Sequence, residues 1–361
     1  MDATGWSTGA ATDGTLREHR GASDAVGVAV LGCCAAWSLI SATARAGRPE
    51  GILLAVLAVI AGYACGRIGG ALVPVAASCA VGLGGLCLAL TAPYAAPAPD
   101  VVTPLGRVGA TAALLALSAG ALCCAAWSAR QPPQRVVLHV LAAGSVAVAA
   151  AVDSPAGITV CAGVVLCSLA AARLRSRALG LTGLGLATSV VAGLGVALAK
   201  GVLPAGSTAS LETWLSHRRI LLWHDAVHLA EVHPALGTGP GRFEDLSPTL
   251  AQAPLSDGKP HSAVLQVAAE QGLIGVLLLA AAYCWLLYVL WRSARSTQVV
   301  LAAGAALTAV AAMATVGNAL SFTTVTAGVG LLAGIATAEP FTNGPPGDDE
   351  AALEFLQGGL D

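Results

Sequence analysis

Charged side chains are scarce in this chain. Only 11% of its 361 residues are Asp, Glu, Lys or Arg, whereas a soluble domain carries about 25%. Hydrophobic residues make up 56% of the sequence. Between residues 24 and 338 they form recurring apolar runs of roughly 20 residues, each long enough to cross a bilayer as a helix. The composition therefore excludes a soluble globular protein and predicts an all-α, polytopic transmembrane helical bundle.

Other features that the sequence lacks narrow the possible functions. The net charge of −2 gives no basis for a nucleic-acid partner. The first 23 residues have no apolar core after a basic start, so we expect the first span, rather than a cleaved signal peptide, to direct insertion. The ten cysteines all fall in apolar segments, which predicts no disulfide framework in the long polar interval. The pairs Cys33-Cys34 and Cys123-Cys124 suggest metal binding or redox chemistry. The simpler interpretation is that they are small side chains in tightly packed helices.

The apolar runs predict about ten spans. The second and third are separated only by Arg67 and glycines. Alanine, glycine and serine are abundant inside the runs, and small residues let helix backbones approach closely in lipid. The expected spans are residues 25–43, 51–66, 70–93, 106–127, 136–152, 156–172, 179–199, 272–291, 298–317 and 320–337.

Arginines in the short connections predict the orientation. With the N-terminus inside the cell, the inner side holds ten arginines and the outer side only Arg45, Arg48 and Arg107, which agrees with the positive-inside rule. We therefore expect a multi-pass protein of the inner (plasma) membrane with both termini cytoplasmic. The expected organisation is a disordered N-terminus (1–23), seven spans (24–199), one large external loop (200–271), three spans (272–338) and a disordered acidic tail (339–361).

The polar interval is the place where chemistry is expected, because it carries most of the histidines. Residues 217–233 predict a short helix with an apolar stripe of Ile220, Trp223, Val227 and Ala230. Such a helix would lie along the membrane surface, with Trp223 and Trp214 at headgroup depth.

Several side chains in this interval have both a functional and a structural interpretation. His224 and His228 are spaced to bind zinc with Glu231 as a third ligand, although such a pair is more often solvated. The fork of Arg219 suits a phosphate or pyrophosphate, or it reaches lipid headgroups. The imidazole of His261 suits proton transfer from an attacking hydroxyl, or it merely precedes a helix.

Three motifs in one order resemble the O-antigen ligase and polymerase family. They are Arg219-x-x-x-Trp223, the turn H-P-A-L-G-T-G-P-G-R-F from His233 to Phe243, and H-S-A-V-L-Q-V-A-A-E-Q-G-L-I-G from His261. The family patterns are an Arg–Trp helix, H-P-L-x-G-x-G-x-G-x-F and H-N-x-x-L-Q-x-x-x-E-x-G-x-x-G. The many-span layout with one large external loop is similar as well. The chain departs from the family pattern at Ser262, where an asparagine is usual, and it has fewer spans than many members.

The resemblance implies a GT-C-like, metal-independent membrane glycosyltransferase without a cofactor. Such an enzyme moves a glycan from an undecaprenyl-diphosphate donor to a glycan or lipid acceptor outside the inner membrane. It makes Arg219 a candidate diphosphate clamp and His261 a candidate base, or a residue that orients the acceptor. Further basic residues are expected around the diphosphate, and Lys200 is one candidate. The other substrate-binding candidates are Arg218, Trp223, Arg242, Lys259 and Gln266.

Three other functions remain open from the sequence. A polysaccharide polymerase would share the donor chemistry and differ in its acceptor. A non-catalytic envelope scaffold would keep the fold and tolerate changes in the loop. A transporter would need charge inside the spans, yet Asp153 and His139 lie near span ends and no ion or proton path is evident.

Overall fold

The computed structural model describes residues 7–91, 104–174, 176–202, 217–251 and 258–339, and all the regular structure within these ranges is helical. The all-α prediction is therefore confirmed. In the part of the chain that the structure describes, eight helices are long and apolar enough to cross a membrane, and two shorter apolar helices accompany them. The eight are α1 (Ser7–Arg45), α2 (Glu50–Leu72), α3 (Pro74–Thr91), α4 (Pro104–Ser128), α5 (Pro132–Ala151), α7 (Arg177–Ala199), α12 (Ala263–Arg292) and α13 (Thr297–Val316). The two shorter ones are α6 (Pro155–Ala171) and α14 (Thr323–Thr337).

Two helix boundaries differ from the sequence-based expectation. Helix α2 continues through Arg67 to Leu72 and ends just before Pro74, because the residue before a proline is disfavoured in the helical region. Arg67 therefore lies inside a helix rather than between two. Helix α1 begins at Ser7, so it extends into the segment for which we predict disorder.

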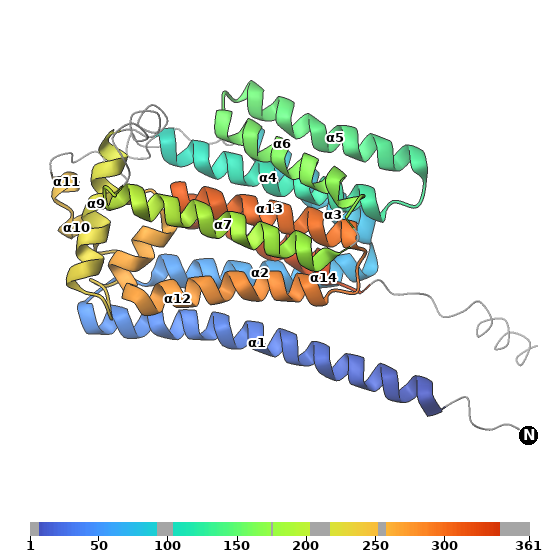
Figure 1. The fold of residues 1–361 in the computed structure, drawn as a ribbon, viewed down its shortest axis with the longest axis horizontal. Coiled ribbons are helices and arrows are strands. Elements are labelled where there is room, and N and C mark those ends of the chain that lie inside the picture. Colours follow the sequence, from blue (N-terminus) through green and yellow to red (C-terminus); the bar gives the residue numbers. More distant parts are fainter. Residues whose placement is uncertain (1–6, 92–103, 175, 203–216, 252–257, 340–361) are drawn as a thin grey trace, which may run out of the picture.

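Helices α4 and α13 form the centre of the bundle. In the apolar stretch that could cross a membrane, 89% of the residues of α4 and 78% of those of α13 are buried. The share is 28% or less in the other six long helices. Helices α3, α5, α6 and α14 pack around α4, and α6 and α7 pack against α13. Figure 1 shows the long helices side by side, with α1 along one flank and α5 along the other. The central pair is built largely from alanine, which allows close approach on every side.

The tightest helix pair joins segments far apart in the sequence. Helices α2 and α14 touch through glycines on both sides. A Cβ built on Gly62 or Gly66 would lie 2.3 Å from the carbonyl oxygen of Ala327 or Leu331. A Cβ on Gly330 or Gly334 would lie 2.2–2.3 Å from a carbonyl oxygen of α2. The two backbones are therefore in direct contact, and a side chain larger than hydrogen does not fit between them.

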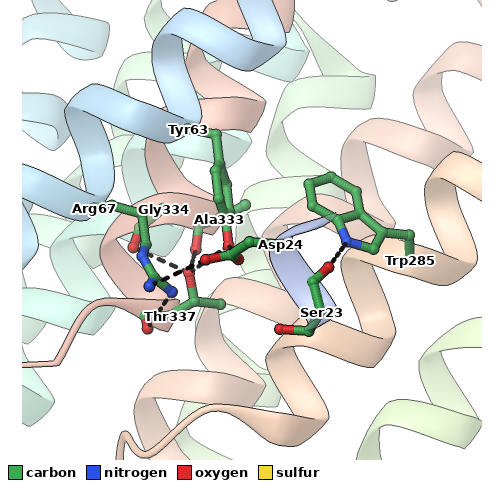
Figure 2. A network of polar contacts seen from close by, with 8 residues as sticks. All are labelled: Ser23, Asp24, Tyr63, Arg67, Trp285, Ala333, Gly334 and Thr337. Carbon is green, nitrogen blue, oxygen red and sulfur yellow. Dashed lines mark hydrogen bonds and ion pairs between the residues drawn. The ribbon is translucent and has the colours of Figure 1, made fainter. Parts of the chain in front are cut away.

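A polar network joins four helices at one end of the bundle, called here the far end (Figure 2). Arg67 pairs with Asp24 at 3.4 Å and donates to the carbonyl of Thr337 at 3.1 Å. Tyr63 donates to Asp24 at 3.0 Å, and the Trp285 indole donates to the carbonyl of Ser23 at 3.0 Å. These contacts fasten α1, α2, α12 and α14 to one another. The Asp24–Arg67 pair also places charge among the spans, where the sequence suggested almost none.

The opposite end, called here the loop end, carries the short helices (Figure 1). These are α9 (His217–Val232), α10 (Phe243–Leu246), α11 (Pro248–Ala251) and the 3-10 turn η1 (Ala319–Ser321). Asp225 of α9 accepts hydrogen bonds from the Ser247 hydroxyl at 2.6 Å and the Thr249 amide at 3.1 Å. A small apolar cluster lies beneath them and includes Leu198, Trp223, Phe243 and Leu265. The polar interval is therefore packed onto the ends of the spans.

Candidate functional site

Helix α9 carries the first of the three motifs. Its extent agrees closely with the helix predicted at 217–233. Leu222, Trp223 and Ala226 face the interior, and Trp223 has no exposed surface. The indole of Trp223 therefore packs against the ends of the spans and is not exposed to lipid, as the expected surface position would require. A fully buried indole shapes the site and does not touch a substrate in this conformation. Trp214 lies outside the described residues.

The two arginines at the start of α9 differ in their surroundings. Arg219 is half-buried, and its Nη1 donates to the carbonyl of Val316 at the end of α13, at 3.2 Å. Its guanidinium is thus held against the bundle rather than extended along lipid. Arg218 is exposed. Arg219 is therefore the better positioned of the two, because the Arg218 side chain lies in solvent.

The second motif forms a turn over residues 237–243, called here the glycine turn. Gly237, Gly239 and Gly241 all have positive φ angles, of 65°, 103° and 73°, which glycine adopts without the penalty that a side chain brings. The amides of Thr238 and Gly239 donate to the carbonyls of Ala269 and Glu270, both at 2.9 Å. A Cβ on Gly237 would lie 2.3 Å from the Glu270 backbone. The glycines therefore let the turn lie directly on the start of α12.

The third motif begins α12. Ser262 is the N-cap, and its hydroxyl accepts from the Leu265 amide at 3.4 Å. Serine and asparagine cap helices about equally well, so the departure from the family pattern at this position keeps a working cap. Helix α12 then kinks at Gly272, with φ 68° and ψ −165°, and the Leu273 amide donates to the carbonyl of Pro234 at 2.8 Å. The kink lies where we predict the span to begin.

His261 stands immediately before this cap. It is 8% exposed and has a φ of 54°, one of three positive values among the described non-glycine residues. A left-handed backbone at a residue with a side chain costs about 1–3 kcal/mol and is found most often at functional sites. The imidazole is therefore held in one place by a strained backbone and by close packing.

A buried carboxyl group lies beneath the glycine turn. Glu270 is 4% exposed. The backbone amides of Gly241 and Phe243 lie near its carboxyl group, and the Lys259 charge acts on it from farther away than an ion pair. Gln266 donates to it at 3.4 Å. Two substrate-binding candidates, Lys259 and Gln266, are thus gathered around Glu270. The motif spacing alone gave Glu270 no such role.

The connection between α1 and α2 forms another wall of the site. The Arg48 amide donates to the carbonyl of Pro240 at 2.6 Å, and Nη1 of Arg242 donates to the carbonyl of Arg45 at 2.8 Å. Arg45 and Arg48 therefore lie at the loop end beside the glycine turn. Sequence reasoning missed them as site residues. The available signal was that both arginines stand on the side that the positive-inside rule disfavours.

The three side chains considered as zinc ligands have different surroundings. His224 and His228 are exposed on α9, while Glu231 pairs with Lys200 at 3.0 Å. Lys200 thus joins the end of α7 to α9 and is engaged away from the glycine turn. Within the described ranges, no group of three or more His, Cys, Asp or Glu side chains is arranged to hold a metal ion.

Taken together, the predicted site residues come from α9, the glycine turn and the start of α12, and the structure brings these three segments together at the loop end (Figure 1). The arrangement places cationic groups and a buried imidazole at the same end of the bundle. Such a site is suited to holding an anionic leaving group near a proton acceptor.

The family model described as O-antigen ligase matches residues 108–280, a range that runs from α4 into α12 and includes all three motifs. A search of curated proteins found no match. The family match agrees with the resemblance that the motifs indicate: over residues 108–280 the chain is similar to the O-antigen ligase family.

Proposed function

We propose that this multi-pass inner-membrane protein transfers a glycan from an undecaprenyl-diphosphate donor to an acceptor hydroxyl on the extracytoplasmic side. The observation that carries the proposal is the meeting of three separate motifs at one end of the bundle. Two hydrogen bonds join the glycine turn to α12 through the Thr238 and Gly239 amides. Arg219, in the first turn of α9, is held against the end of α13. The family match over residues 108–280 supports the same reaction class.

The proposed reaction needs a base and a charge-stabilising group. The acceptor oxygen forms a bond to the anomeric carbon of the glycan, and the bond from that carbon to the diphosphate oxygen breaks. The acceptor proton passes to the imidazole of His261, because histidine is the side chain that most often accepts a proton in such a step. The lipid diphosphate leaves with the bonding electrons.

Cations near the diphosphate stabilise this departure. Arg219 is the proposed clamp, because its planar fork can bind two phosphate oxygens at once. Arg242 and Lys259 lie at the glycine turn and at Glu270, where they add positive charge, and Arg218 is exposed beside Arg219. Positioning and charge neutralisation supply most of the rate in this scheme, since the diphosphate is already a good leaving group.

The test is glycan transfer by the purified protein in detergent or nanodiscs. Wild type is expected to move a glycan from a polyprenyl-diphosphate donor to an added acceptor. His261→Ala is expected to lower the rate by at least about 100-fold, the usual size of a general-base contribution, and Arg219→Ala by a similar factor. His228→Ala, an exposed position on the same helix, is the matched control and should keep full activity.

The acceptor distinguishes a ligase from a polymerase. A ligase would transfer to a lipid or other unrelated acceptor, whereas a polymerase would extend the same glycan repeat. Normal transfer by both His261→Ala and Arg219→Ala would contradict the proposal. Donor binding without any transfer by wild type would indicate a non-catalytic relative.

A further inference from the structure

Glu270 is the one Asp or Glu among the described residues that falls in the buried class. Removing an acidic side chain from water costs several kcal/mol unless hydrogen bonds or an opposite charge compensate. A carboxyl group retained in such a place therefore needs a reason. Its partners supply one, because they belong to the site and not to the bundle core.

The carboxyl group of Glu270 lies near both sides of Arg242. The backbone amide of Gly241, just before Arg242, and that of Phe243, just after it, both approach this group. The backbone carbonyl of Glu270 accepts from the Gly239 amide at 2.9 Å. One residue of α12 thus lies against three residues of the glycine turn.

The position of the glycine turn determines where the cationic side chains lie. Arg242 reaches the Arg45 carbonyl at 2.8 Å, and Pro240 holds the Arg48 amide at 2.6 Å. Lys259 also lies near Glu270. Gln266, one turn earlier in α12, donates a hydrogen bond to the Glu270 carboxyl group. The partners of Glu270 are therefore connected to cationic residues from three different segments of the chain.

We propose that Glu270 is a positioning residue that sets the place of Arg242 and Lys259 for binding the diphosphate group of the donor. It acts through the two amides of the glycine turn and through the Lys259 charge, and it does not itself touch the substrate. The inference rests on the proposed function for the identity of the ligand.

The test measures binding of undecaprenyl diphosphate to wild type, Glu270→Ala and Glu270→Gln. Glu270→Ala removes both acceptors, and affinity is expected to fall about 10- to 100-fold, because a small displacement of binding groups has effects of that size. Glu270→Gln keeps one carbonyl oxygen that can accept from an amide, and it should recover part of the loss. Asp245→Asn, an exposed change in α10, is the control and should bind as wild type does.

Amide hydrogen exchange supplies a readout that needs no ligand. Exchange at Gly241 and Phe243 should be faster in Glu270→Ala than in wild type and nearly normal in Glu270→Gln. Unchanged exchange in Glu270→Ala would overturn the proposed contact. Faster exchange with unchanged affinity would overturn the positioning role and leave Glu270 as a structural residue.

Transfer kinetics separate this inference from the proposed function. Positioning of the donor predicts that Glu270→Ala raises the donor KM and leaves the acceptor KM unchanged, whereas simple loss of folded protein would lower the apparent kcat alone. If wild type binds undecaprenyl diphosphate but transfers no glycan, the proposed function fails, while the affinities still decide the role of Glu270. If wild type does not bind undecaprenyl diphosphate, both fail.

Discussion

At the scale of single residues, His261 combines an unfavourable backbone conformation with a position in the candidate site. Its φ of 54° lies in the region that glycine occupies at no steric cost. An ordinary helix-entry residue has no need of this conformation, because any of several extended conformations can precede an N-cap. The strain is consistent with selection for the place of the imidazole, at some cost in stability.

Replacing His261 by two small residues tests this interpretation. Both His261→Ala and His261→Gly remove the imidazole, and both should abolish transfer. Glycine normally destabilises a folded chain relative to alanine. At a positive φ the order should reverse, and His261→Gly should be more stable than His261→Ala by about 1 kcal/mol. Thermal unfolding in detergent measures the difference, and a lower Tm for the glycine variant would argue against the left-handed backbone.

The motif residues could be found from the sequence, but their partners could not. Arg219, His261 and the glycines follow a recognisable spacing. The roles of Glu270, Arg45 and Arg48 depend on contacts between segments about 30 to 200 residues apart, and local spacing carries no record of such contacts. Trp223 was misplaced for a related reason, since a helical stripe identifies an apolar face and does not identify what covers it.

At the scale of elements, the contact between α2 and α14 depends on glycine. Gly66→Ala would put a Cβ 2.3 Å from the Leu331 carbonyl oxygen, so the two helices must separate. Overpacking of this kind costs about 1–3 kcal/mol. The variant should unfold at a lower temperature than wild type. Gly84→Ala is the matched control, because nothing lies within 4 Å of its Cβ position. Equal stability of the two variants would mean that the helices do not touch as described.

Most elements were predictable, and their ends were less so. Apolar runs identified all ten apolar helices, because a bilayer requires long uncharged segments whose backbone hydrogen bonds are satisfied internally. The break between α2 and α3 was misplaced, since Arg67 suggested a connection whereas Pro74 makes it. The kink at Gly272 divides α12 into two helical segments, and its φ of 68° accompanies the close approach of residues 234 and 235. Tertiary contact of that kind cannot be read from a local pattern.

At the scale of the whole molecule, the two ends of the bundle have different characters. The far end is fastened by polar contacts between helix termini, including the Asp24–Arg67 pair and the bond from Arg177 to the Ser293 carbonyl at 2.6 Å. The loop end carries the short helices and the candidate site. This asymmetry agrees with the arginine distribution, because the far end also holds Arg173, Arg292 and Arg295, which the positive-inside rule assigns to the cytoplasm.

The orientation leads to a labelling prediction with two single cysteines. Asp245→Cys in α10 and Arg173→Cys after α6 are both at exposed positions, at the loop end and the far end respectively. On intact cells, a membrane-impermeant maleimide should label the cysteine at 245 and not the one at 173, which should react only after the membrane is permeabilised. The parent chain, whose ten cysteines lie in apolar segments, supplies the background.

The reverse pattern would place Arg219 and His261 in the cytoplasm, where the proposed extracytoplasmic acceptor is absent. Because it would also put the larger group of arginines outside, that result would count against both the arginine rule for this chain and the proposed reaction.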